Sequence, residues 1–173
     1  MKKIIISFTL LFVSFCMKGQ IQRFTYTTTI GIGIAMNEPS YTSLSWHVLG
    51  YYNIGKWFSA GIGTGLSFYE VPLIPLFVNA KLAITRPNKF TPYVEFGSGY
   101  AFAPSKNASG GFYLNPSVGV QYALSDKLKL HLAVGYELQK LERLKNFENQ
   151  YFTSGFAENL NHNSLSVKVG IVF

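Results

Sequence analysis

Cysteine is almost absent from this sequence: Cys16 is the single one, so no disulfide framework or cysteine-based zinc site can form within the chain. No run of apolar residues reaches the roughly 20 that a membrane-spanning helix needs. The three histidines show no metal-ligand spacing, and the glycines recur at period two rather than in a phosphate-binding loop. The sequence therefore predicts neither a metal site nor a cofactor.

Charge is also scarce. Charged residues make up 13% of the chain and aromatic residues 16%, whereas about a quarter of a soluble domain is usually charged. Outside the first 19 residues, 12 basic and 8 acidic residues leave a net charge of only +4. These basic residues are spread out, so we expect no nucleic-acid partner. A chain that is apolar overall, but never over a long run, is typical of a membrane β-barrel.

The first 19 residues have the pattern of a secretory signal peptide. Lys2 and Lys3 precede an apolar run over residues 4–15, which is too short for a spanning helix. No small-residue motif marks the cleavage site, which we place after Gly19. Phe15 directly precedes Cys16 and disfavours lipoprotein processing there, because that processing needs a small residue. Residues 20–173 then form one domain.

Eight segments alternate between apolar residues and small or polar ones, as strands with one apolar face do. The apolar residues fall on even positions in the first seven segments and on odd positions in the last. Eleven residues at about 3.3 Å each, tilted by about 40°, rise roughly 27 Å, which matches the apolar band of a membrane barrel. The segments are 24–36, 41–52, 58–68, 74–85, 94–102, 114–124, 128–139 and 165–173.

The connections between these segments alternate in length. Tight turns are expected at 53–56, 86–90 and 125–127, and longer connections at 37–40, 69–73, 103–111 and 140–161. Outer-membrane barrels have short periplasmic turns and longer external loops. An even number of strands places both termini on the short-turn side, which we expect to be periplasmic.

A soluble lipocalin-type barrel would carry the same alternation with its apolar face inside. Its outer face should then be rich in Lys, Glu and Asp, but the polar face here is mostly Gly, Ser, Thr and Ala. Small residues suit the crowded interior of an eight-stranded barrel, and closure satisfies every strand edge in lipid. The predicted fold is all-β: a closed eight-stranded antiparallel up-and-down transmembrane β-barrel.

The last segment, with apolar Val169, Ile171 and Phe173, resembles the C-terminal assembly signal of bacterial outer-membrane barrels. With the strand count and the loop asymmetry, it makes the chain similar to the small outer-membrane barrel family that includes OmpX and the transmembrane domain of OmpA. This resemblance implies the cell outer membrane as location, and its lipid and the barrel-assembly machinery as partners. It implies no activity.

Several charged or ionisable residues fall on the predicted inward face, where buried charges need partners. A turn centred on Asn88 would place Lys81 opposite Glu95, which predicts an ion pair in the lumen. The register of Glu137 against Lys168 stays open. Eight strands leave no continuous channel, which disfavours a small-solute pore. The predicted lumen network consists of His47, Lys81, Glu95, Lys129, His131, Glu137 and Lys168.

An enzyme is the alternative from another class. His162-Asn163-Ser164 resembles the His-x-Ser pair of outer-membrane lipid A deacylases, with Glu158 or Glu137 available to orient the imidazole. In that family the motif continues into an Asn-containing stretch and a further strand, which this chain lacks. We therefore expect no catalytic site.

Residues 140–161 form the longest predicted connection, and such length favours a function. Leu138, Leu141, Leu144 and Phe147 recur at near-helical spacing, so a short helix and an extended hairpin both remain open. The main hypothesis is a non-enzymatic structural or adhesin-like surface protein that contacts an extracellular protein or glycan through this loop. The candidate recognition residues are Arg143, Phe147, Tyr151, Phe152 and Phe156.

Overall fold

The computed structural model describes residues 23–37, 42–69, 71–104, 108–125, 127–149 and 152–173, without the side chains of 143–159. The predicted signal peptide and Tyr151 lie outside this part. None of the described residues belongs to a helix long and apolar enough to cross a membrane. The strands are β1 (Phe24–Ala35), β2 (Ser43–Asn53), β3 (Phe58–Phe68), β4 (Pro72–Ala83), β5 (Phe90–Phe102), β6 (Ala108–Ser109), β7 (Gly111–Ala123), β8 (Lys129–Asn149) and β9 (Phe152–Val172).

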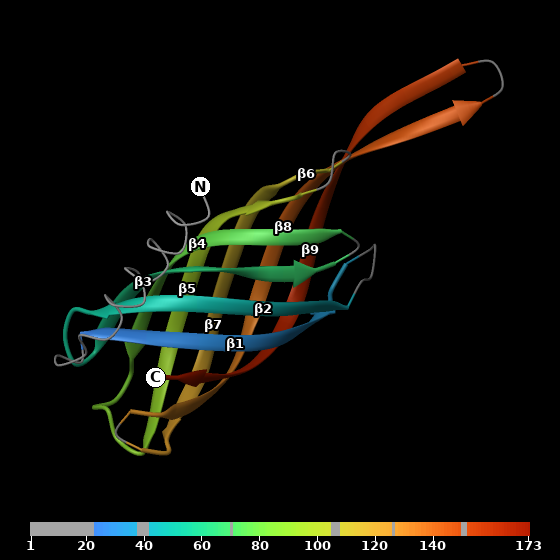
Figure 1. Ribbon diagram of the computed structural model, residues 1–173. Helices are drawn as coiled ribbons and strands as arrows, with labels where there is room; N and C mark the ends of the chain where they lie inside the picture. The colour runs from blue at the N-terminus through green and yellow to red at the C-terminus, as the bar shows by residue number, and fades with distance from the viewer. Residues whose placement is uncertain (1–22, 38–41, 70, 105–107, 126, 150–151) are drawn as a thin grey trace, which may run out of the picture.

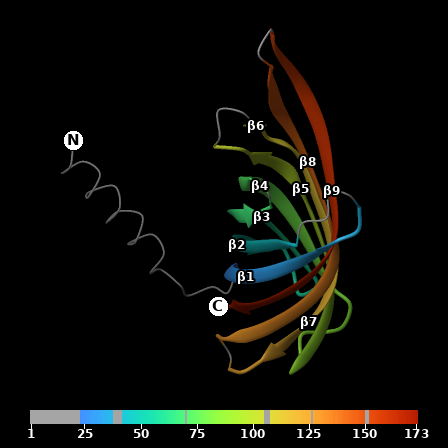
Figure 2. The same ribbon diagram turned by 90° about the vertical axis from the view of Figure 1, so that its right-hand side faces the viewer.

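The strands form a closed antiparallel barrel (Figures 1 and 2). β9 returns to β1, and their register runs from Thr27 opposite Val172 to Ala35 opposite Ser164. The two-residue β6 only pairs with β8 at the barrel rim, so the wall consists of the other eight strands. The predicted fold is confirmed.

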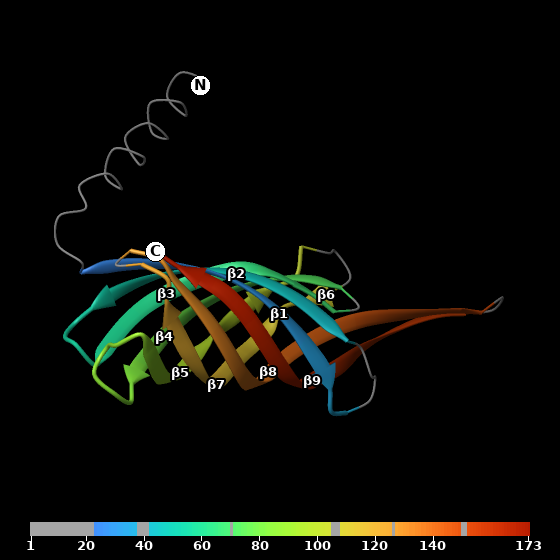
Figure 3. The ribbon, with the colours of Figure 1, turned by 90° about the horizontal axis from the view of Figure 1, so that it is seen from below.

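The barrel has two unlike ends. The connections β2–β3, β4–β5 and β7–β8 lie at one end together with the C-terminus, which we call the turn end (Figure 1). The β8–β9 hairpin projects from the opposite end, the loop end (Figure 3). Short turns and a terminus therefore share one end, as the alternating connections predicted.

The sequence pattern places the starts of β5 and β7 too late. β5 begins at Phe90 rather than at residue 94, and β7 begins at Gly111 rather than at 114. Pro92 breaks the sequence pattern because it has no N–H to donate to a neighbouring strand. Its carbonyl nevertheless accepts a hydrogen bond from the Ile84 N–H at 2.9 Å, and its position opposite Val120 is kept.

The prediction of a loop over 140–161 is wrong, and the hairpin alternative is correct. β8 and β9 are each 21 residues long, and their pairing continues to Asn149 opposite Phe152. The near-helical spacing of the leucines forms no helix, because backbone hydrogen bonds to β9 keep this segment extended. The last strand thus begins at Phe152, well before the predicted residue 165.

The outer face of the wall is apolar. Large apolar side chains on the predicted outward positions are exposed, for example Ile62 at 66% and Val78 at 64%. The indole N–H of Trp46, also on this face, donates to Thr28 Oγ1 at 3.1 Å, so it needs no water. Aromatic residues gather near both rims, as in membrane barrels. They are Phe24, Tyr26, Tyr52, Phe90, Tyr122 and Phe173 at the turn end, and Phe68, Tyr100, Phe102 and Phe112 at the loop end.

The lumen holds more large apolar side chains than the sequence pattern suggested. They pack against inward glycines: a Cβ on Gly63 would lie 2.6 Å from Phe77 Cζ and 2.9 Å from Leu49 Cγ. Phe77 and Leu49 lie directly opposite Gly63 on the two neighbouring strands, so the absence of a side chain at Gly63 leaves room for both. The buried apolar cluster is Leu49, Tyr51, Leu73, Phe77, Ala101, Tyr113, Leu141 and Leu160.

Candidate functional site in the barrel lumen

All seven residues of the predicted lumen network point into the barrel. Five are buried, among them Glu137 at 1% and Lys168 at 5% exposure. Glu95 is half-buried and lines the centre of the lumen, and Lys129 lines its turn-end opening. The strands place these residues at different heights, so the side-chain contacts decide which of them interact.

Glu137 is the centre of one hydrogen-bonded group. The Tyr69 hydroxyl donates to its Oε1 at 2.5 Å, and Asn115 Nδ2 donates to its Oε2 at 3.2 Å. Lys168 Nζ donates to Asn115 Oδ1. The register places Glu137 opposite Ser164 and Lys168 opposite Ala133, so the two charges are not cross-strand neighbours. Asn115 on β7 bridges them instead.

The two inward histidines near the barrel centre have structural partners. His131 Nε2 lies 3.0 Å from Thr29 Oγ1, and its Nδ1 lies 3.0 Å from the Tyr93 hydroxyl oxygen. His47 Nε2 lies 3.3 Å from Ser67 Oγ. Within the described residues, no three His, Cys, Asp or Glu side chains are grouped to hold a metal ion.

Lys81 and Glu95 lie directly opposite each other on β4 and β5, the register that a turn centred on Asn88 requires. Lys81 Nζ lies 4.3 Å from the ring centroid of Tyr93 and 5.0 Å from that of Tyr51. The Glu95 carboxylate accepts a hydrogen bond from Asn79 Nδ2 at 3.0 Å. The ammonium thus meets two aromatic faces, which stabilise a cation, and the direct ion pair stays a prediction.

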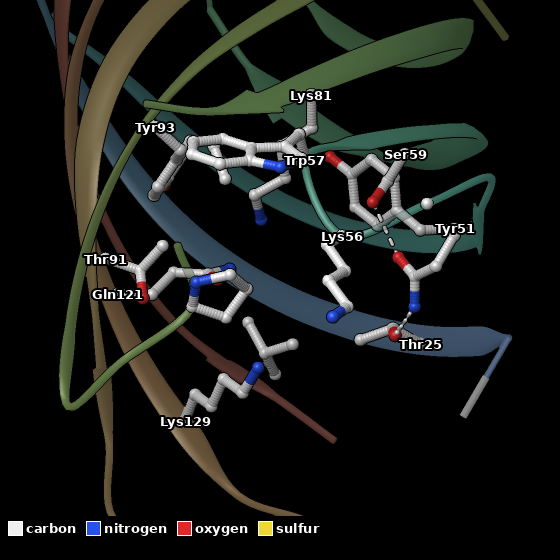
Figure 4. A pocket seen from close by; sticks show the side chains of 15 residues that line it. Thr25, Tyr51, Lys56, Trp57, Ser59, Lys81, Thr91, Tyr93, Gln121 and Lys129 are labelled. Carbon is white, nitrogen blue, oxygen red and sulfur yellow. Dashed lines mark hydrogen bonds between the residues drawn. The ribbon is translucent and has the colours of Figure 1, made fainter. Parts of the chain in front are cut away.

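Within the described residues, the barrel interior has a small central cavity and a larger one at the turn end. The central one measures only about 10 Å³ and is lined by residues that include Asn79, Glu95 and Lys168. That is hardly enough for one water, so side chains close the centre of the lumen. The second cavity, of about 290 Å³, opens at the turn end (Figure 4).

His162 and Ser164 face the lumen. Their exposed fractions are 4% and 2%, and the Tyr69 ring stacks on the imidazole with 5.1 Å between ring centroids. A lipid in the outer leaflet contacts the outside of the wall, whereas these two side chains lie behind it. The arrangement therefore does not favour a lipid A deacylase.

The predicted assembly residues lie on the outer wall. Val169, Ile171 and Phe173 are exposed at 54%, 38% and 57%. Phe173 also completes the barrel seam, because its backbone exchanges two hydrogen bonds with Tyr26, at 2.7 and 2.9 Å. The side chains of Arg143, Phe147, Phe152 and Phe156 lie outside the described part of the structure.

Sequence reasoning missed Tyr69 and Asn115 as members of the network. Asn115 occupies an inward position of β7, and its amide has the donor and the acceptor needed to join a carboxylate to an ammonium. Tyr69 follows the last residue of β3 and keeps that strand's inward parity. Parity therefore could have found both residues, but not their partners.

No protein-family model matches the sequence, and no curated protein matches it either. Solved structures do match the fold. OprG from Pseudomonas aeruginosa has a TM-score of 0.67 at 8% identity, covering 86% of this chain and 94% of OprG. Neisserial surface protein A has a TM-score of 0.60 at 14% identity, covering 88% and 98%.

The N-terminal β-barrel domain of Pseudomonas aeruginosa OprF has a TM-score of 0.53 at 13% identity, covering 87% of this chain and 96% of that domain. Identities this low establish the fold and leave the activity unassigned. The chain therefore has the fold of the small eight-stranded outer-membrane β-barrels, the architecture of OmpX and of the transmembrane domain of OmpA.

Proposed function

We propose that this outer-membrane barrel is a non-enzymatic surface protein whose β8–β9 hairpin contacts an extracellular protein or glycan. The observation that carries the proposal is strand length. β8 and β9 have 21 residues each, whereas β1 to β5 and β7 have 11 to 13. The extra residues project from the loop end as a two-stranded ribbon (Figures 1 and 3).

In this proposal the hairpin faces the cell exterior, and the turn end and both termini lie in the periplasm. The short connections support it, since periplasmic turns of outer-membrane barrels are short. The exposed side chains of Val169, Ile171 and Phe173 would then lie on the outer wall near its periplasmic rim. The barrel-assembly machinery could bind them there. Recovery in the outer-membrane fraction, with heat-dependent gel migration, is the expected result of fractionation.

The backbone of the ribbon supports a protein partner in particular. The pairing of β8 with β6 ends at Arg143, and the contacts of β9 with residues 36–37 end at Asn161, whose carbonyl accepts a hydrogen bond from Asn37 Nδ2 at 2.5 Å. Beyond these points, in the described residues, the two strands pair only with each other. Both outer edges therefore offer N–H and C=O groups to an added strand.

The test shortens only the ribbon. Leu144 lies opposite Ala157, so a two-residue Asn-Gly turn can replace residues 145–156 and keep the strand register. We expect heat-dependent gel migration to persist and binding to host cells or matrix proteins to be lost. A control variant replaces residues 38–41 by four Gly and Ser residues, which keeps the Asn37 hydrogen bonds to β9, and should bind like the parent.

Two outcomes would contradict this proposal. Undiminished binding by the shortened variant would show that another surface of the protein binds the partner. A parent protein that binds none of a panel of cells, matrix proteins and glycans would indicate a purely structural role.

The enzyme alternative is tested separately. We expect the parent protein to leave the lipid A of a susceptible host unchanged by mass spectrometry, because His162 and Ser164 face the lumen. A deacylated product that disappears with His162→Ala or Ser164→Ala would instead establish the enzyme.

A further inference from the structure

Three lysines converge at the turn-end opening of the lumen. Lys56 comes from the β2–β3 turn, Lys81 from β4 and Lys129 from the start of β8, and all three line the cavity of about 290 Å³. No acidic side chain is among the described residues that line it. Figure 4 shows Lys56 and Lys129 entering the cavity from different sides. We call this cavity the lysine mouth.

The wall of the lysine mouth is held in place by its own hydrogen bonds. Ser59 donates to Asn53 Oδ1 at 2.6 Å, and Asn53 Nδ2 donates to Thr25 Oγ1 at 2.7 Å (Figure 4). This chain ties β3, β2 and β1 together at the rim. The opening is therefore a formed feature of the barrel, and a ligand need not order these side chains.

Glu95 and the C-terminal residue, both in the described part of the chain, have other partners. Glu95 lies deeper, lines the central cavity and accepts from Asn79. The backbone oxygen of the C-terminal Phe173 accepts from the Tyr26 N–H at 2.7 Å, which places that end in the seam between β9 and β1. The Lys81 ammonium also lies over the rings of Tyr51 and Tyr93. Of the three lysines of the lysine mouth, Lys56 and Lys129 have no such partner in the described part of the chain, and we take these two as available to a ligand.

We propose that the lysine mouth binds a small oxyanion, a phosphate or carboxylate group, between the ammonium groups of Lys56 and Lys129. A recess lined by charges of one sign concentrates the field and raises the local concentration of counter-ions. The ammonium groups bind an oxyanion through charge-assisted hydrogen bonds. A volume near the small end of the usual ligand range, about 300–1,000 Å³, favours a small molecule over a polymer.

Binding is measured on the full mature chain folded in an uncharged detergent. Inorganic phosphate and succinate are titrated separately by calorimetry. We expect saturable binding of at least one of them. Lys56→Gln and Lys129→Gln should each weaken it about tenfold, because each change removes one charge-assisted hydrogen bond. Lys127→Gln is the matched control, since Lys127 is exposed in the β7–β8 turn and does not line the cavity.

A lipid headgroup is the other source of phosphate. In a second experiment, the protein is placed in nanodiscs with and without phosphatidylglycerol. The NMR chemical shifts of residues near Lys56 and Lys129 are then compared. Shifts that require the anionic lipid would assign the site to a headgroup, and shifts with free phosphate alone would assign it to a solute. An absence of response to phosphate, succinate and anionic lipid would overturn the proposal. Equal weakening by Lys127→Gln would also overturn it, because the effect would then reflect net surface charge.

This result is independent of the proposed role of the hairpin. The lysine mouth and the β8–β9 ribbon lie at opposite ends of the barrel (Figure 1). The variant with the shortened hairpin should therefore bind the oxyanion like the parent. Failure of one proposal leaves the other standing.

Discussion

The centre of the lumen and its turn-end opening both contain lysines, but the lysines differ in their burial and in their acidic partners. In the centre, Lys168 is 5% exposed and shares Asn115 with the Glu137 carboxylate. At the opening, Lys56 and Lys129 line a cavity of about 290 Å³ with no acidic neighbour in its described lining. Water can reach Lys56 and Lys129 at the opening, whereas it is excluded from Lys168 and Glu137 in the centre. The contrast follows from the cost of removing a charge from water without a partner.

The largest expected effect comes from breaking the central network. Glu137→Leu removes the acceptor of Tyr69 and Asn115 and leaves the Lys168 charge buried without its carboxylate. We expect the free energy of unfolding to fall by about 3–5 kcal/mol, measured by urea unfolding from lipid or detergent. Adding Lys168→Met should restore part of the loss. The exposed Glu142 on the same strand is the control, and Glu142→Gln should change stability by less than about 0.5 kcal/mol.

The second effect concerns packing in the centre. A Cβ at Gly63 would lie 2.6 Å from Phe77 Cζ, so Gly63→Ala should destabilise the barrel by about 1–3 kcal/mol. Adding Phe77→Leu should recover part of the loss, since the contact with Leu49 Cγ at 2.9 Å would remain. Gly50→Ala is the matched control, because a Cβ there meets only the Tyr26 ring at 3.8 Å. Equal losses for both glycines would show that strand propensity, rather than lumen packing, sets the cost.

A smaller effect is expected between the two regions. Lys81 lines the lysine mouth and lies opposite Glu95, so water weakens the interaction of their charges. A double-mutant cycle of Lys81→Met and Glu95→Gln should give a coupling of about 1 kcal/mol. Additive effects would mean that the two side chains do not interact. A coupling as large as that of Glu137 with Lys168 would mean that the lysine mouth is dry.

The smallest effect is expected at the opening itself. Lys56→Gln and Lys129→Gln should each change the free energy of unfolding by less than about 0.5 kcal/mol, because both ammonium groups already face water. The same urea experiment measures this. A loss comparable to that of Glu137→Leu would show that the opening is part of the structural core. The proposed difference between the opening and the centre would then be wrong.

The sequence by itself determined the number of wall strands, their parity and the apolar outer face. These properties are local, since a strand alternates its side chains whatever lies opposite. Even so, Pro92 and the leucines of residues 138–144 misled the strand bounds, because backbone pairing with a neighbouring strand outweighed the local pattern.

Only the tertiary structure decided which inward side chains meet. Asn115 on β7 joins Lys168 on β9 to Glu137 on β8, and Tyr69 reaches the same carboxylate from beyond β3. Barrel closure and the register between strands bring these atoms together across the lumen. The same closure places Lys56, Lys81 and Lys129 around one opening. Period two specifies a face but no height along the barrel, so a single sequence cannot reveal such contacts.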